Sequence, residues 1–157
     1  MTGPLLVLSG LAVILLGLSA GIHLCGVAAL NPALRALDGP VYLAVKQSTD
    51  RYFPALMRPL TLAGIGVLLG LTVLAAIDGR STVAALDAVG LIAGLVALLG
   101  VLRGDLPINL RMADWVGDHL PSDWRTWQAR WERWFRLRTV ATGVSFLATL
   151  AGLVALP

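Results

Sequence analysis

Charged residues are scarce in this chain: Asp, Glu, Lys and Arg together make up only 13% of its 157 residues. Soluble domains usually carry about a quarter charged residues, so the composition excludes an ordinary soluble domain. Cysteine is scarcer still, because Cys25 stands alone, and an internal disulfide is excluded. What the chain has in abundance is apolar residues, 57% of the total with a mean hydropathy of +0.82.

Most of these apolar residues lie in four long runs. The runs cover residues 5–30, 59–77, 83–102 and 139–156, and within them only His23 and Asp87 can carry a charge. A membrane-spanning helix needs roughly 17–25 such residues. The first run is also longer than the apolar core of a signal peptide, and no basic residue precedes it. We therefore expect it to be retained as a membrane helix and not cleaved as a signal peptide. The sequence predicts an all-α fold: one integral membrane domain, a four-transmembrane-helix bundle.

The basic residues predict how this bundle is oriented. All of them except Arg80 lie in the segments between the runs, residues 31–58 and 103–138. Lys and Arg are retained on the cytoplasmic side of a membrane, so both segments are expected to be cytoplasmic loops and both termini to face outward. The expected location is the bacterial inner (plasma) membrane. Prolines favour a short helix over residues 41–53, and the two loops are expected to form a cap over the cytoplasmic end.

The second loop carries an unusual pattern of tryptophan and arginine. Trp124, Trp127, Trp131 and Trp134 are spaced by 3, 4 and 3 residues, which places them in one stripe of an amphipathic helix running into the fourth span. Glu132 and Arg136 are expected to pair on another face. The stripe is either an aromatic belt at the membrane surface or the wall of a site. Nucleic-acid binding is disfavoured because acidic residues interrupt the basic ones, and attraction to anionic lipid accounts for the same charge.

Several short motifs near the loops resemble a known family. They are Pro107-Ile108-Asn109, Trp115, the WERW stretch at 131–134 followed by Arg138, Asn31-Pro32-Ala33-Leu34, and Gln47. These motifs resemble the anthrone-oxygenase-like family of small four-helix membrane proteins, long filed as a domain of unknown function. The similarity extends over nearly the whole chain, although only these patches are specific.

The resemblance implies a chemistry. Fungal relatives are similar to oxygenases that convert anthrones to anthraquinones without an obvious metal or flavin motif, so no cofactor is implied. Such a reaction needs a base for a carbon-bound proton, a cation or donor that holds the enolate, and an apolar site that admits dioxygen and excludes water. Members often have Asn or His at the position of Phe135. If that side chain takes part in their chemistry, the departure implies a changed activity or substrate here.

His23 is the candidate base, because it lies inside the first run, roughly 10 Å from its cytoplasmic end. Two alternatives stay open: a neutral histidine bonded to a neighbouring helix, or an axial ligand of haem or another metal, for which His23 is the only candidate. Arg130 and Arg138 match the motifs and are candidates for holding the enolate, with Asn109 as a hydrogen-bonding group.

The remaining candidates contact the substrate or serve structure. Trp131 offers a flat face to an aromatic substrate, and Trp115 and Gln47 are added to the substrate-binding set through the motifs. Alternatively, all these loop residues clamp the two loop helices together. His119 lies in a polar turn and is expected at the surface, Cys25 is expected to pack, and Asp87 is assigned to structure or topology, with Arg80 as a conceivable partner.

Two functions from different classes therefore remain. One is a membrane-embedded oxygenase acting on an aromatic or quinone-like lipophilic molecule that enters from the cytoplasmic leaflet. The other is a non-catalytic scaffold, subunit or lipophile-binding protein, and a cavity or a packed core beside His23 distinguishes the two. A channel is disfavoured because the helices show no polar stripe. Membrane lipid and a hydrophobic small molecule are the expected partners, nucleic acid is not, and a homo-oligomer stays open.

Overall fold

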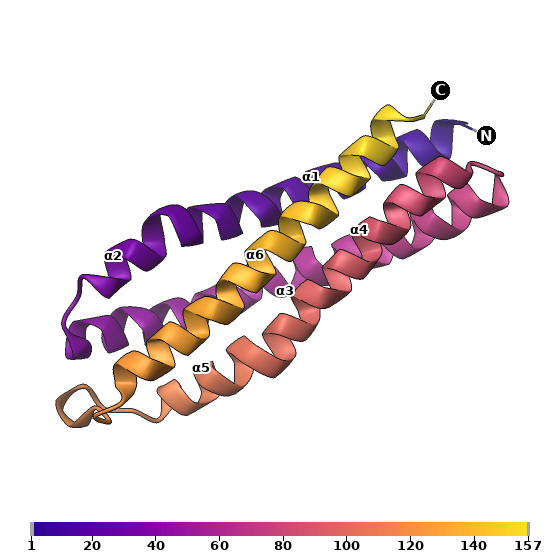
Figure 1. Ribbon diagram of the computed structural model, residues 1–157. Coiled ribbons are helices and arrows are strands. Elements are labelled where there is room, and N and C mark those ends of the chain that lie inside the picture. Colours follow the sequence, from indigo (N-terminus) through magenta and orange to yellow (C-terminus); the bar gives the residue numbers. More distant parts are fainter. Residues whose placement is uncertain (1, 157) are drawn as a thin grey trace.

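The computed structural model describes residues 2–156 and shows four antiparallel helical rods (Figure 1). The first consists of α1 (Thr2–Cys25), a π-helical segment η1 (Gly26–Leu30) and α2 (Asn31–Arg35), and the second is α3 (Gly39–Ile77). The third consists of α4 (Ser81–Gly100), a π-helical segment η2 (Val101–Asp105) and α5 (Leu106–Ala113). A 3-10 turn η3 (Gly117–His119) precedes the fourth, α6 (Trp124–Val154).

All four rods are long and apolar enough to cross a membrane. The predicted all-α four-helix fold of an integral membrane protein is therefore confirmed. α6 packs against α4 and α1, and α3 packs against the same two helices, so the rods form a closed ring. Both termini and the turn at residues 78–80 lie at one end, which we name the terminal end (Figure 1). Residues 36–38 and 114–123 connect the rods at the other end, the loop end.

The predicted loops are mostly helix. Residues 31–58 form α2 and the first half of α3, which continues through Pro54 and Pro59 where a break at residue 53 was expected. A proline removes one backbone hydrogen bond, but packing neighbours compensate for this loss in membrane helices. Residues 103–138 form α5, η3 and the first half of α6. The prediction of a cap folded over the bundle is therefore wrong, because these segments lengthen the rods instead.

The turn at the terminal end follows a recognised helix-capping pattern. Gly79 has φ of +71°, a conformation that favours glycine. Its N–H donates to the carbonyl of Ala76 at 3.1 Å, and the N–H of Arg80 donates to the carbonyl of Ala75 at 2.9 Å. This is the Schellman arrangement, which satisfies the last carbonyls of α3 and lets α4 begin directly.

The core divides into two clusters along the bundle. Near the terminal end it is aliphatic, and near the loop end it consists of Ile108, Met112, Trp131 and Phe135. Trp115, Trp127 and Trp134 pack against this second cluster, so the tryptophan stripe faces the bundle and not the lipid. The stripe therefore packs against the core and does not form a lipid-facing aromatic belt. The segments that pack on the stripe are η2 and α5, and they contain the motif at residues 107–109.

Candidate functional site

A buried polar cluster lies at the loop end and is centred on Lys46, the only lysine of the chain. Lys46 is 1% exposed although it comes from a segment predicted to be a loop. Its Nζ donates to Oδ1 of Asn109 at 2.8 Å and to the carboxylate of Asp50 one turn along α3, and it lies 4.5 Å from the ring centroid of Trp131. An ammonium group leaves water only when its donors are satisfied, and these three partners do so.

A second ion pair completes the cluster on the side of α6. The guanidinium of Arg138 pairs with the carboxylate of Asp105 in η2, and Asp105 is 2% exposed. Arg138 also lies over the ring of Phe135, 4.7 Å from its centroid. The rings of Phe135 and Trp131 are 5.1 Å apart. Two adjacent aromatic rings therefore connect two ion pairs inside the bundle.

His23 enters the cluster from α1. Its imidazole is 5% exposed and meets the ring of Phe135 edge on, with 5.7 Å between the centroids. Within residues 2–156, no hydrogen-bond partner contacts Nδ1, and Nε1 of Trp131, Nε of Arg138 and Oδ1 of Asp105 are also buried without one. Buried polar atoms are almost always paired in proteins, so four unpaired ones in the same cluster are unusual. One alternative for His23 is a neutral histidine hydrogen-bonded to a neighbouring helix. Its Nδ1 makes no such hydrogen bond within residues 2–156.

The formal charges of the cluster balance. Lys46 and Arg138 contribute two cations, and Asp50 and Asp105 contribute two anions. The two ion pairs are close enough to act on each other, since Asp105 interacts electrostatically with both cations. Arg138 also acts on His23. Buried ions are stable only when they are paired, so these four side chains depend on one another. The arrangement places a proton acceptor, two cations and two aromatic faces inside a water-poor interior.

Both π-helical segments lie at the level of this cluster. Gly26 begins η1, and a Cβ on it would overlap the ring of Phe135. Gly104 lies in η2, and a Cβ on it would overlap the ring of Trp134. A π-helical turn inserts a residue into a helix and is often found at functional sites. Here the two widened turns, each backed by a glycine, make room for the aromatic side chains of α6.

A further polar group joins the rods closer to the loop end. The carboxylate of Glu132, which is 5% exposed, accepts two hydrogen bonds from Nε of Arg35, at 2.7 and 2.9 Å. The expected pair between Glu132 and Arg136 is thus wrong, because Glu132 faces the bundle. Arg125 donates to the carbonyl of Arg35 at 3.1 Å, and Tyr42 stacks on Trp124 with 5.4 Å between the centroids. These contacts fasten the α2–α3 connection to α6.

Two of the predicted substrate-binding residues lie beside the cluster. The side-chain nitrogen of Gln47 donates to the carbonyls of Met112 at 2.9 Å and of Trp115 at 3.0 Å, and so caps the end of α5. Trp115 is half-buried against the second core cluster. Gln47 therefore fastens α3 to the end of α5. This is the structural role considered above, in which the loop residues clamp two helices together.

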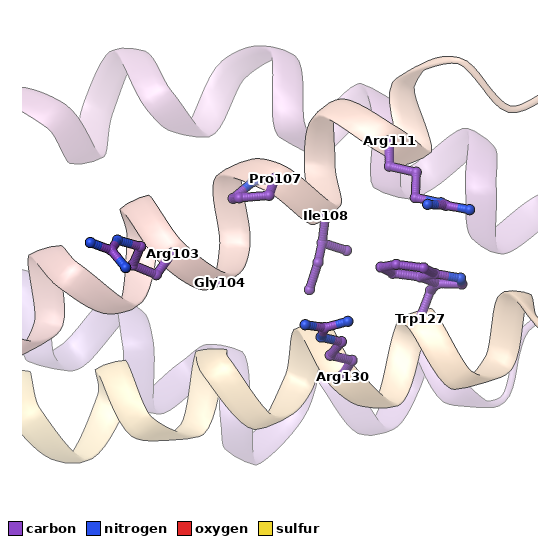
Figure 2. Close-up of a pocket in the computed structure, with 7 residues that line it drawn as sticks. All are labelled: Arg103, Gly104, Pro107, Ile108, Arg111, Trp127 and Arg130. Atoms are coloured by element: carbon purple, nitrogen blue, oxygen red, sulfur yellow. The ribbon is translucent and has the colours of Figure 1, made fainter.

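Arg130 is not brought together with the other candidates. It is exposed on the outer face of α6, 5.5 Å from the ring centroid of Trp127, and it lines a surface pocket of about 300 Å³ (Figure 2). The helical repeat could have shown this. Trp131, Phe135 and Arg138 are spaced by four and three residues and share a face, whereas Arg130 lies about 100° around the helix from Trp131.

Among the predicted site residues, the structure therefore gathers His23, Asn109, Trp131 and Arg138. Sequence reasoning missed Lys46, Asp50 and Asp105, which it treated only as loop charges. A usable signal existed for Asp105, because it lies three residues after the third apolar run and two residues before the motif at 107–109. No signal marked the pairing of Lys46 with Asn109, since 63 residues separate them.

The spans also contain buried polar groups outside the cluster. Asp87 is 1% exposed and lies against Gly152, so it does not reach the interface, and the salt bridges found within residues 2–156 do not include it. Ser9, Ser19, Thr142, Ser145 and Thr149 are buried as well. Ser145 donates to the carbonyl of Gly90 at 2.8 Å, and the hydroxyls of Thr142 and Thr149 bond within α6. Of these hydroxyls, that of Ser145 joins α6 to α4.

Within residues 2–156 there is no group of three or more His, Cys, Asp or Glu side chains that could hold a metal ion. His23 as a single axial ligand stays a prediction. Cys25 is exposed and does not pack in the core as expected. Comparisons of the chain with protein-family models, curated proteins and solved structures find no match. The resemblance to the anthrone-oxygenase-like family therefore also stays a prediction.

Proposed function

We propose that the protein is a membrane-embedded oxygenase that acts on an aromatic or quinone-like lipophilic molecule at the buried polar cluster, whose side chains must move apart to admit it, because neither surface pocket is lined by His23. The packed core beside His23 is the feature expected of the alternative, a non-catalytic scaffold, subunit or lipophile-binding protein. The observation that carries the proposal is the burial of an imidazole, an ammonium and a guanidinium around two adjacent aromatic rings. Such groups are costly to bury in a membrane protein and usually mark a functional site. The same groups are the ones that oxidation of an anthrone requires.

In the proposed reaction, each group has one role. The imidazole of His23 takes the acidic carbon-bound proton of the substrate. Arg138, whose Nε has no hydrogen-bond partner within residues 2–156, donates to the enolate oxygen that forms. Lys46, oriented by Asn109, adds positive charge beside it. Trp131 and Phe135 contact the flat ring system. Dioxygen oxidises the enolate, so that anthrone and O2 give anthraquinone and water, with one oxygen atom in the new carbonyl and the other in water.

Orientation and location belong to the same proposal. All basic residues except Arg80 lie in the loop-end half of the rods or in the connections there, which supports a cytoplasmic loop end and outward termini. We propose the bacterial plasma membrane as the location. A hydrophobic substrate would then reach the cluster from the inner leaflet.

The oxygenase proposal predicts a specific loss of activity. Protein purified in detergent is incubated with an anthrone, and oxygen uptake and anthraquinone absorbance are followed. Replacing His23 by alanine is expected to lower the rate by about 100-fold or more, the usual contribution of a positioned base. The matched control is His119→Ala, which removes the other histidine, exposed in η3, and keeps the wild-type rate.

Three outcomes contradict the proposal. The first is equal rates for His23→Ala and His119→Ala. The second is a Soret band in the absorption spectrum that disappears in His23→Ala, because that would make His23 an axial ligand and not a base. The third is binding without turnover, seen as quenched tryptophan fluorescence with no product, which would identify a lipophile-binding protein instead.

A further inference from the structure

Two adjoining pockets lie on the outer face of the bundle near the loop end. One, of about 300 Å³, lies between α6 and the η2–α5 segment and is lined by Arg103, Arg111, Arg130 and Trp127, among others. Figure 2 shows Arg111 reaching from α5 over the ring of Trp127, with Arg130 and Trp127 rising from α6. The other pocket, of about 350 Å³, shares Arg130 and adds Arg133. Four exposed guanidinium groups therefore surround one surface region.

These guanidinium groups have no acidic partner. The salt bridges within residues 2–156 join Arg35 to Glu132, Lys46 to Asp50 and Arg138 to Asp105, and none includes the four arginines. Two of them are held in place by an aromatic ring, since Arg111 and Arg130 lie 4.3 and 5.5 Å from the centroid of Trp127. Stacking fixes a guanidinium and leaves its N–H edge free to donate. The pocket is thus a cationic surface that lacks its counter-charge.

The positions of the pocket arginines relative to the apolar runs indicate the level of the lipid headgroups. Arg103 directly follows the third apolar run, and Arg133 precedes the fourth by six residues, about 9 Å along a helix. The interfacial layer begins at the end of the hydrocarbon core. Exposed leucines continue the apolar surface toward the pockets: Leu137 lines one of them, and Leu102 and Leu106 are exposed on the neighbouring segment. A ligand here meets guanidinium groups at one end and an apolar surface at the other.

We propose that these pockets bind the phosphate headgroup of an anionic phospholipid, with its acyl chains lying along the exposed leucines. Guanidinium forks match phosphate oxygens and can donate two hydrogen bonds to them. Charge complementarity selects an anionic lipid, because the cationic group of a zwitterionic choline lipid would meet the same four arginines. The site lies on the outer face, apart from the buried polar cluster, so this inference does not depend on the proposed oxygenase activity.

Native mass spectrometry of the full chain in detergent tests this assignment, with phosphatidylglycerol and phosphatidylcholine of equal acyl length as the probes. The wild type is expected to bind phosphatidylglycerol at least tenfold more tightly than phosphatidylcholine. The double variant Arg111→Gln/Arg130→Gln is expected to lose about tenfold or more of this affinity. The matched control Arg51→Gln/Arg58→Gln removes the same charge from exposed positions of α3 and should bind as the wild type does.

Several results would overturn the proposal. Equal binding of the two lipids by the wild type rules out a headgroup site, whether or not the double variant folds. An equal loss in the α3 control would show a general charge effect without a defined pocket. Inorganic phosphate that displaces phosphatidylglycerol at similar concentration would show a phosphate site with no role for the acyl chains. Phosphatidylglycerol binding that survives excess inorganic phosphate supports the lipid assignment.

Discussion

Replacing Arg138 by leucine is expected to lower the free energy of unfolding by about 3–5 kcal/mol, the usual cost of breaking a buried ion pair. The substitution leaves the carboxylate of Asp105 buried without its cation. The measurement is an SDS titration in detergent micelles, followed by far-ultraviolet circular dichroism. Arg136→Leu is the matched control, because Arg136 is exposed on the same helix and its loss should change stability by at most about 0.5 kcal/mol.

A double variant separates the ion pair from simple packing. Arg138→Leu/Asp105→Leu removes both charges, and apolar pairs often replace buried ion pairs without loss of stability. We therefore expect it to recover most of the stability lost in the single variant. A double variant that is as unstable as Arg138→Leu would contradict the assigned pairing.

Phe135→Ala is expected to cost about 3–5 kcal/mol, as large aromatic truncations in a core usually do. Phe135 is 6% exposed and contacts His23, Trp131 and Arg138, so its loss opens a cavity in the middle of the buried polar cluster. The same SDS titration measures the effect. Phe53→Ala is the control, because Phe53 is 38% exposed on α3 and should lose less than about 1 kcal/mol.

The cavity left by Phe135→Ala offers a second readout. Its walls include His23 and Arg138 as well as Trp131, and Phe135→Leu, which fills part of it, should lose less stability than Phe135→Ala. A variant as stable as Phe53→Ala would mean that Phe135 faces lipid, and the account of the cluster would then be wrong.

The sequence was sufficient for the global fold, because each span carries its own signal in an apolar run bounded by charges. It was not sufficient for helix lengths. Residues 31–58 contain polar side chains and prolines, which locally favour a loop, but α3 is continuous through Pro54 and Pro59. Prolines are tolerated inside membrane helices, so a proline alone does not mark the end of one.

Only part of the candidate site could be predicted from the sequence, because some of its residues are buried through contacts with distant parts of the chain. His23 is conspicuous because an ionisable residue inside an apolar run has few explanations. Lys46 and Glu132 are inconspicuous, because a charged residue in a predicted loop is expected to be solvated. Their burial depends on partners 63 and 97 residues away in sequence, Asn109 and Arg35. Only the three-dimensional arrangement reveals such pairs.

Two faces of α6 contribute to two different candidate sites, and the position of a residue around the helix decides to which site it belongs. Trp131 and Arg138 face inward to the buried polar cluster, whereas Arg130 and Arg133 face the pockets at the outer surface. The same arginine-rich stretch therefore supplies a buried ion pair and a cationic outer face. In the sequence, the tryptophans and arginines of this stretch look like a single motif. In the structure, they belong to two different faces of α6.

The account depends most on the burial of charged side chains at the loop end, and acylation of Lys46 tests this directly. Detergent-solubilised protein is treated with an amine-reactive acetylating ester, and mass spectrometry follows the peptide that contains Lys46, the only lysine of the chain. The control variant Arg51→Lys adds a lysine at an exposed position of the same helix. In folded protein, Lys46 should react at least about 100-fold more slowly than the lysine at position 51, and the two should react alike after unfolding in SDS. Equal reactivity in the folded state would show that Lys46 is accessible to solvent, and the buried polar cluster would not exist.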